Sequence, residues 1–115
     1  MHEYSIVQAL LERVEAEASG RGATSVRRLH VRIGEVSGVE IDLLRKAYGV
    51  FCERTVCENA ELSIVPVAAR WQCPRCNVEI RRGSILRCPG CSVPATLSAG
   101  DEIFLDRIEM EVANV

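Results

Sequence analysis

Residues 25–34, SVRRLHVRIG, carry an apolar residue at every second position from Leu29 to Ile33, a period that differs from that of the preceding sequence. Leu29, Val31 and Ile33 alternate with arginine or histidine, and this alternation is typical of a strand with one buried face. Gly34 then ends the run. The sequence therefore predicts a strand here, whose apolar face other elements must cover.

The segment before this strand, residues 3–19, has helical periodicity. Its apolar residues recur at steps of three and four, whereas most of its glutamates fall on the opposite side. Gly20 and Gly22 are expected to end the helix. The predicted buried stripe consists of Ile6, Val7, Leu10, Leu11, Val14 and Ala18.

A second helix is predicted over residues 37–51, SGVEIDLLRKAYGVF. Ser37 and Glu40 have the spacing of a capping box, in which a hydroxyl and a carboxylate satisfy the first free N–H groups of a helix. The apolar residues again follow the helical period. The predicted buried stripe consists of Leu43, Leu44, Ala47, Tyr48 and Phe51.

Residues 60–65, AELSIV, predict a second strand. Leu62 and Ile64 are expected to point inward, and Pro66 is expected to close the strand. A strand–helix–strand unit of this length suggests a crossover connection, which places the two strands in parallel with the helix on one face.

The last apolar segment, residues 103–112, alternates in two phases. Ile103 and Leu105 share one phase, and the apolar residues that follow take the other. A single-residue bulge near Asp106 or Arg107 would reconcile them. Because this strand is too apolar to stand alone, we expect it to complete the sheet. The expected fold class is α+β, a small α/β domain with a three-stranded mixed sheet packed with two helices.

Two Cys-x-x-Cys motifs, CPRC at 73–76 and CPGC at 88–91, are separated by eleven residues. Each motif forms a tight turn that brings two sulfurs to one ion, and two such turns complete a tetrahedron around zinc. Pro74 and Pro89 preset the turns, and Gly90 is expected to relieve a Cβ clash. A redox pair and unpaired core thiols are the alternatives. The expected zinc ligands are Cys73, Cys76, Cys88 and Cys91.

Four thiolates fill the coordination sphere of zinc, so we expect a structural ion and a protein that is not an enzyme. The segment 70–97 holds both motifs, is rich in proline and glycine, and has little periodicity. It is therefore expected to be a zinc-ribbon insertion in an α/β domain formed by residues 1–69 and 98–115.

Charge favours a metal site over a nucleic-acid interface. The five arginines of the segment 70–97 outnumber its single glutamate, and they are explained as compensation for zinc-bound thiolates. A zinc-ribbon adaptor that binds nucleic acid or protein is the alternative function, although Trp71 is the only aromatic residue there for base stacking. The whole chain has a net charge of −2, which gives no bulk attraction to nucleic acid or to an anionic membrane.

We expect the chain to fold in the cytoplasm. No run approaches the roughly 18 apolar residues of a membrane span, and the first twenty residues lack the pattern of a secretory leader. In a reducing compartment, paired cysteines indicate a metal more often than a disulfide. Cys52 and Cys57 are expected to be a core thiol and a partly exposed thiol, with a second metal site or a disulfide as alternatives.

The chain begins Met1-His2-Glu3. A histidine at position two offers its imidazole and its amide nitrogen beside the α-amine of residue one, in adjoining chelate rings. Such planar nitrogen donors suit Ni(II) or Cu(II) better than zinc, and Glu3 could add its backbone nitrogen or an axial carboxylate. A frayed terminus with a solvated histidine is the alternative. His30, on the polar phase of its strand, is expected to be a surface residue.

Four segments in this order resemble one family nearly end to end. They are MHE at the start, IGEVSGVEIDLLRKAY at 33–48, the two cysteine motifs, and GDEIFLDRIEMEV at 100–112. Together they resemble the hydrogenase nickel-incorporation proteins of the HypA/HybF type. Tyr4 stands where an aliphatic residue is common in that family, and Cys52 with Cys57 lies outside the family pattern.

The resemblance implies a function. It implies a nickel metallochaperone that delivers Ni(II) to a [NiFe]-hydrogenase precursor, and to urease in some organisms. The Met1 amine, His2 and the Glu3 backbone match the family's nickel ligands, and the four motif cysteines match its zinc ligands. The implied partners are the GTPase HypB, the hydrogenase large subunit and urease accessory proteins. A monomer or weak homodimer is expected, without membrane or nucleic-acid binding.

Overall fold

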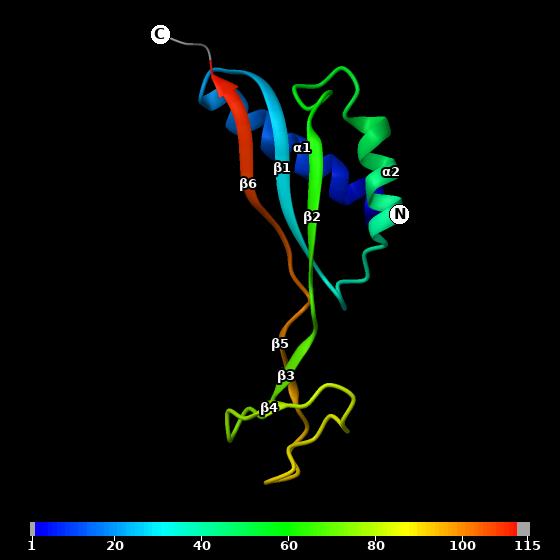
Figure 1. The fold of residues 1–115 in the computed structure, drawn as a ribbon, viewed down its shortest axis with the longest axis vertical. Coiled ribbons are helices and arrows are strands. Elements are labelled where there is room, and N and C mark those ends of the chain that lie inside the picture. Colours follow the sequence, from blue (N-terminus) through cyan, green and yellow to red (C-terminus); the bar gives the residue numbers. More distant parts are fainter. Residues whose placement is uncertain (1, 113–115) are drawn as a thin grey trace.

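The computed structural model describes residues 2–112, apart from the side chain of His2. Figure 1 shows an elongated molecule with helices and long strands at one end and short strands at the other. The elements in chain order are α1 (His2–Gly20), β1 (Ala23–Gly34), α2 (Ile41–Phe51), β2 (Glu61–Val67), β3 (Arg70–Gln72), β4 (Glu79–Ile80), β5 (Thr96–Ala99) and β6 (Ile103–Val112).

The larger part, here called the body, consists of α1, α2 and a sheet in the order β2-β1-β6. β1 pairs in parallel with β2 and antiparallel with β6. The inward residues of β1 are almost fully buried, with Leu29 at 0% and Ile33 at 1% exposure. They share one apolar core with Val14 of α1 and Leu44 of α2. The expected mixed three-stranded sheet, the parallel pair and the packing with two helices are confirmed.

The expected bulge in the last strand is confirmed at Asp106. His30 lies opposite Arg107 and Val31 lies opposite Leu105, so Asp106 is the extra residue on β6. Because the bulge shifts the alternation by one position, apolar residues on both sides of it can face the core.

The start of α2 differs from the prediction. The helix begins at Ile41, and its N-cap residue Glu40 makes no side-chain capping hydrogen bond. The Ser37 hydroxyl instead accepts from the Val39 N–H at 3.3 Å, so the capping box is wrong. The Glu40 N–H donates to the Glu3 carboxylate of α1 at 3.1 Å. A carboxylate 37 positions away thus supplies the acceptor that a local side chain was expected to supply.

Two residues of the predicted stripe on α2 are exposed. Leu43 is 47% and Phe51 45% accessible, whereas Leu44, Ala47 and Tyr48 are buried as expected. Phe51 packs edge-on against Tyr4 of α1, with ring centroids 5.3 Å apart. The buried face is narrower than predicted because α2 contacts the core along only one side.

Pro66 does not end its strand, because β2 continues to Val67. β2 is an edge strand, and an edge strand can hold a proline where the missing N–H would face away from the sheet.

The smaller part, here called the ribbon, is a sheet in the order β4-β3-β5 with the two cysteine turns at its far end. It joins the body where β2 leads into β3 and β5 leads into β6. At this junction a Cβ on Gly34 would lie 2.1 Å from the Gly100 carbonyl oxygen, so the two backbones meet too closely for any side chain. Among residues 2–112, no helix combines the length and apolarity that crossing a bilayer requires.

Candidate metal centre

Two turns of matching backbone geometry carry the four motif cysteines. In the first, the Cys73 N–H donates to the Val78 carbonyl at 2.9 Å, and the Asn77 N–H donates back to the Cys73 carbonyl. In the second, the Cys88 N–H donates to Val93 at 2.9 Å, and the Ser92 N–H donates back to Cys88. The two motifs thus build the same turn twice, once between β3 and β4 and once before β5.

The residue after each motif has a left-handed backbone, with φ of 58° at Asn77 and 64° at Ser92. Asparagine adopts this conformation more readily than most residues, so position 77 carried a signal that sequence reasoning missed. The role expected for Gly90 is wrong. A Cβ there would lie 3.7 Å from the Cys88 sulfur, which is ordinary van der Waals contact, and Arg75 holds the equivalent position in the first turn.

The four sulfurs lie within 4.8 Å of one another. Cys91 Sγ is 3.5 Å from Cys73 Sγ and 3.8 Å from Cys76 Sγ. Zinc bonded to four sulfurs at about 2.3 Å needs them about 3.8 Å apart, so this cluster matches a tetrahedral Zn(Cys)₄ site. Cys88 completes the set. The structure therefore brings together all four predicted ligands.

The protein environment stabilises one thiolate strongly. The Cys76 and Arg75 N–H groups point at the Cys73 sulfur from 3.3 and 3.4 Å, and the pKa of Cys73 falls to about 7, chiefly through the Cys76 N–H. Hydrogen bonding with Cys91 and Cys73 raises the pKa of Cys76 to about 12. Further thiolates therefore need a cation among them, which is the charge that a metal ion supplies.

Apolar residues surround the sulfurs on the protein side. Cys73 and Cys88 are buried together with Ile80, and Trp71 and Val93 pack against them. The cluster offers four sulfur ligands and no further His, Asp or Glu among residues 2–112, which is the composition of a closed structural site.

Three of the five arginines in this segment have partners other than the thiolates. Arg70 pairs with Glu79 at 2.7 Å, and Arg82 pairs with Glu35 of the body at 2.5 Å. Arg87 donates to the Ser92 carbonyl at 2.7 Å. The expected compensation of thiolate charge is therefore wrong for Arg70 and Arg82, whose charges are neutralised by carboxylates, and stays a prediction for Arg87, which meets only a carbonyl.

Cys52 and Cys57 are both buried free thiols, which corrects the expected partial exposure of one of them. Burial raises the pKa of Cys57 to about 11 and also raises the pKa of Cys52. Both therefore remain protonated at neutral pH and serve as apolar core residues, far less suited to metal than Cys73.

The predicted nickel ligands are only partly described. Met1 and the side chain of His2 lie outside the described residues. Glu3 is described, and its carboxylate accepts the hydrogen bond from Glu40. The first turn of α1 therefore lies beside the N-terminus of α2, a contact that sequence reasoning missed because no local pattern encodes it.

His30 is not a free surface residue. Its Nε2 lies 2.5 Å from the Glu109 carboxylate and 3.2 Å from Arg107 on β6. The His30 side chain is 21% exposed. This hydrogen bond lowers the pKa of Glu109. The contact joins β1 to β6 on the sheet face opposite the core.

A family model described as hydrogenase/urease nickel incorporation, metallochaperone, hypA matches residues 1–110. A hydrogenase maturation factor HypA from Aquifex aeolicus is 40% identical over 114 residues, covering 97% of this chain and 99% of that protein. A protein of the same description from Wolinella succinogenes is also 40% identical, covering 96% of both.

Two solved structures have the same fold. The solution structure of the Ni metallochaperone HypA from Helicobacter pylori has a TM-score of 0.72 at 29% identity, and covers 96% of this chain and 97% of that one. A second solution structure of a HypA protein has a TM-score of 0.78 at 31% identity, and covers 96% of each chain.

Proposed function

Since this chain belongs to the HypA family of hydrogenase/urease nickel-incorporation metallochaperones, we propose that it carries Ni(II) at its N-terminus and delivers it to a [NiFe]-hydrogenase precursor. The family consists of metallochaperones and not enzymes. The single observation that carries the proposal is the family match over residues 1–110, which includes both the N-terminal tripeptide and the cysteine quartet.

Nickel is bound by the α-amine of Met1, the amide and imidazole nitrogens of His2, and the backbone nitrogen of Glu3. Four nitrogens in a plane suit the d-electron preference of Ni(II). The start of α1 at His2 supports this donor set, because the first amides of a helix have no intrahelical acceptor. The Glu3 carboxylate can keep its hydrogen bond to Glu40 while the Glu3 backbone binds nickel.

The same donor set also accounts for the release of nickel to an acceptor. Donors at a chain end can be exchanged one at a time as an acceptor approaches, whereas a preformed cage would hold the ion more tightly. Zinc at Cys73, Cys76, Cys88 and Cys91 cross-links the two turns and leaves no position for cargo. Nickel and zinc therefore have separate sites and separate roles.

The proposed partners follow from the family. The GTPase HypB and the hydrogenase large subunit are the first candidates, and urease accessory proteins are further ones. Delivery takes place in the cytoplasm. The presence of urease in the family description supports two acceptor pathways.

The decisive experiment is a Ni²⁺ titration of untagged protein with absorption and X-ray spectroscopy. His2→Ala is expected to abolish nickel binding while zinc content and fold stay intact. A Gly-Ser extension before Met1 should do the same, because it moves the α-amine away. His30→Ala is the matched control, since it removes the only other histidine and should leave nickel affinity unchanged.

Competition between protons and Ni²⁺ for the same nitrogens gives a second test of the N-terminal site. Imidazole and amide nitrogens bind metal only after losing protons, so affinity should fall as the pH drops through the histidine range. Sulfur donors in the spectrum, or flat affinity between about pH 5 and 8, would contradict the N-terminal site.

A further inference from the structure

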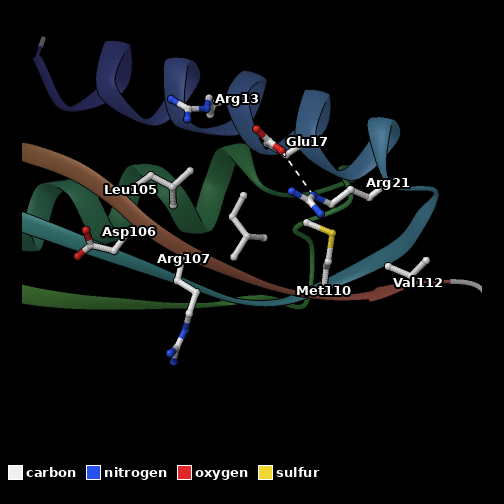
Figure 2. A pocket seen from close by; sticks show the side chains of 9 residues that line it. Arg13, Glu17, Arg21, Leu105, Asp106, Arg107, Met110 and Val112 are labelled. Atoms are coloured by element: carbon white, nitrogen blue, oxygen red, sulfur yellow. Dashed lines mark ion pairs between the residues drawn. The ribbon is translucent and has the colours of Figure 1, made fainter.

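A groove runs between α1 and β6 on the core side of the sheet. Two adjoining cavities of about 380 and 270 Å³ lie along it, and Arg13 and Leu105 line both. Figure 2 shows α1 lying above β6, with Leu105 and Met110 projecting toward the helix and Arg107 pointing away from it. Met110 is only half-buried and Val112 is 53% exposed, so the core does not fill this space.

β6 also forms one edge of the sheet, and the two edges differ. The opposite edge strand, β2, contains Pro66, which lacks an N–H, and its Leu62 carbonyl accepts from the Arg45 guanidinium at 2.8 Å. β6 contains no proline. After the bulge at Asp106, residues 107–112 continue the strand along this edge. An edge without such protection is a template for a further strand.

The helix side of the groove is basic. The Arg13 side chain has no hydrogen bond or ion pair within residues 2–112, and the Arg21 side chain is 69% exposed with only a 3.7 Å contact to the Glu17 carboxylate. Glu17 also lines the helix side, so two arginines and one glutamate leave a net charge of +1 there. The charged residues of β6 that line the groove are paired on the opposite face. Asp106 accepts from Arg32 at 2.7 Å, and Arg107 lies against His30 and Glu109. The Arg13 side chain is thus left for an anionic partner, and Arg21 is held only by a long, exposed contact that such a partner can replace.

We propose that this groove binds an extended, acidic segment of a partner protein, which adds to β6 as a fourth strand. Arg13 and Arg21 are eight residues apart, about 12 Å along the helix. Positions i and i+4 of a strand span about 13 Å and face the same side. The segment therefore carries acidic residues at i and i+4, with an aliphatic residue at i+2 over Met110. Main-chain hydrogen bonds to β6 supply affinity, and these side chains supply specificity.

An extended chain fits better than a second copy of this protein. A second copy that paired through β6 would offer Glu109 and Glu111 as its acidic residues after the bulge. Neither glutamate lies on the face toward Arg13, so a second copy would not meet the basic side of the groove. The groove is separate from the proposed nickel and zinc ligands, so this inference does not depend on the nickel site.

The test is selection of a phage-displayed library of random dodecapeptides on the zinc-loaded full chain. The enriched peptides are expected to carry the acid-x-aliphatic-x-acid pattern and, as synthetic peptides, to slow amide exchange at residues 107–112. The double variant Arg13→Glu, Arg21→Glu should weaken their binding by about tenfold or more. The matched control is Lys46→Glu, Arg81→Glu, two exposed cations outside the groove, which should leave binding unchanged. Nickel titration should be unaffected by either pair.

Three results of the peptide selection would overturn the proposal. They are no enrichment, enriched peptides that lack acidic residues, and enriched peptides that protect amides elsewhere. Protection of residues 107–112 that rises with protein concentration in the absence of peptide would also overturn it, because a second copy would then occupy the edge.

Discussion

The body and the ribbon are both built around a three-stranded sheet, but different forces hold them together. Among residues 2–112, fifteen buried residues form one core in the body, from Val7 of α1 to Leu62 of β2. The ribbon buries Cys73, Ile80 and Cys88, and two of these three are metal ligands. A unit this small cannot bury enough apolar surface to offset the entropy of ordering its chain. The body is therefore expected to fold by apolar burial and the ribbon by coordination.

The largest expected effect is loss of the ribbon when its metal is removed. Cys88→Ser should eliminate zinc and disorder residues 70–99 while the body keeps its structure. Structural zinc contributes about 10–16 kcal/mol in small zinc-binding peptides, far more than the apolar core of the ribbon can supply. Zinc analysis measures the loss of metal, and amide exchange measures the order of the ribbon and of the body separately. Cys52→Ala is the control, since it should lower the free energy of unfolding of the body without loss of zinc. A ribbon that stays ordered without metal would contradict the claim that coordination holds it together.

Removing a core side chain from the body is expected to have a smaller effect than removing the metal from the ribbon. Leu29 is fully buried on the central strand of the body. Leu29→Ala should destabilise the body by about 2–5 kcal/mol, because it removes buried apolar surface and leaves a cavity. Zinc content should not change. Unfolding in denaturant is followed by the signal of Tyr48 for the body and of Trp71 for the ribbon. An equal loss of stability in both parts would mean that they fold as one unit.

The smallest effect concerns the contact between the two parts. Both Glu35 carboxylate oxygens pair with Arg82, and Glu35 also accepts from the Ala69 N–H at 2.8 Å. These contacts, the Arg82 hydrogen bond first, lower the pKa of Glu35 from 4.5 to about 2. Because the folded pKa is depressed, the stabilisation is fully present above pH 4.5 and is lost as the pH falls toward 2.

The test of this contact is Glu35→Gln, with Arg82→Gln and the double variant to complete a cycle. The stability difference between wild type and Glu35→Gln should be constant above pH 5 and shrink below about pH 4.5. Zinc content is followed in parallel, because acid also releases zinc. Residual dipolar couplings should show a more variable angle between body and ribbon in the variant. An unchanged angle would mean that Gly34 and Gly100 alone fix it.

Much of the fold could be predicted because its signals are local. Alternation in β1, the change of phase in β6 and the Cys-x-x-Cys spacing each depend on residues a few positions apart, and each led to the observed strand, bulge or turn. The failures had distant causes. The capping box was wrong because the acceptor for the Glu40 N–H lies on α1, and Arg82 was misassigned because its carboxylate partner, Glu35, lies in the body.

By itself, the sequence determined which segments of the body form helices and strands, which two strands run parallel, and which four sulfurs gather, because periodicity and short spacing encode these features directly. The three short strands of the ribbon have no such periodicity and were not predicted. Only the tertiary structure decided that Glu3 meets the start of α2, that Glu35 holds Arg82, and that β6 is left beside a basic groove. These features depend on how separate elements approach one another, and packing of the whole chain sets that approach.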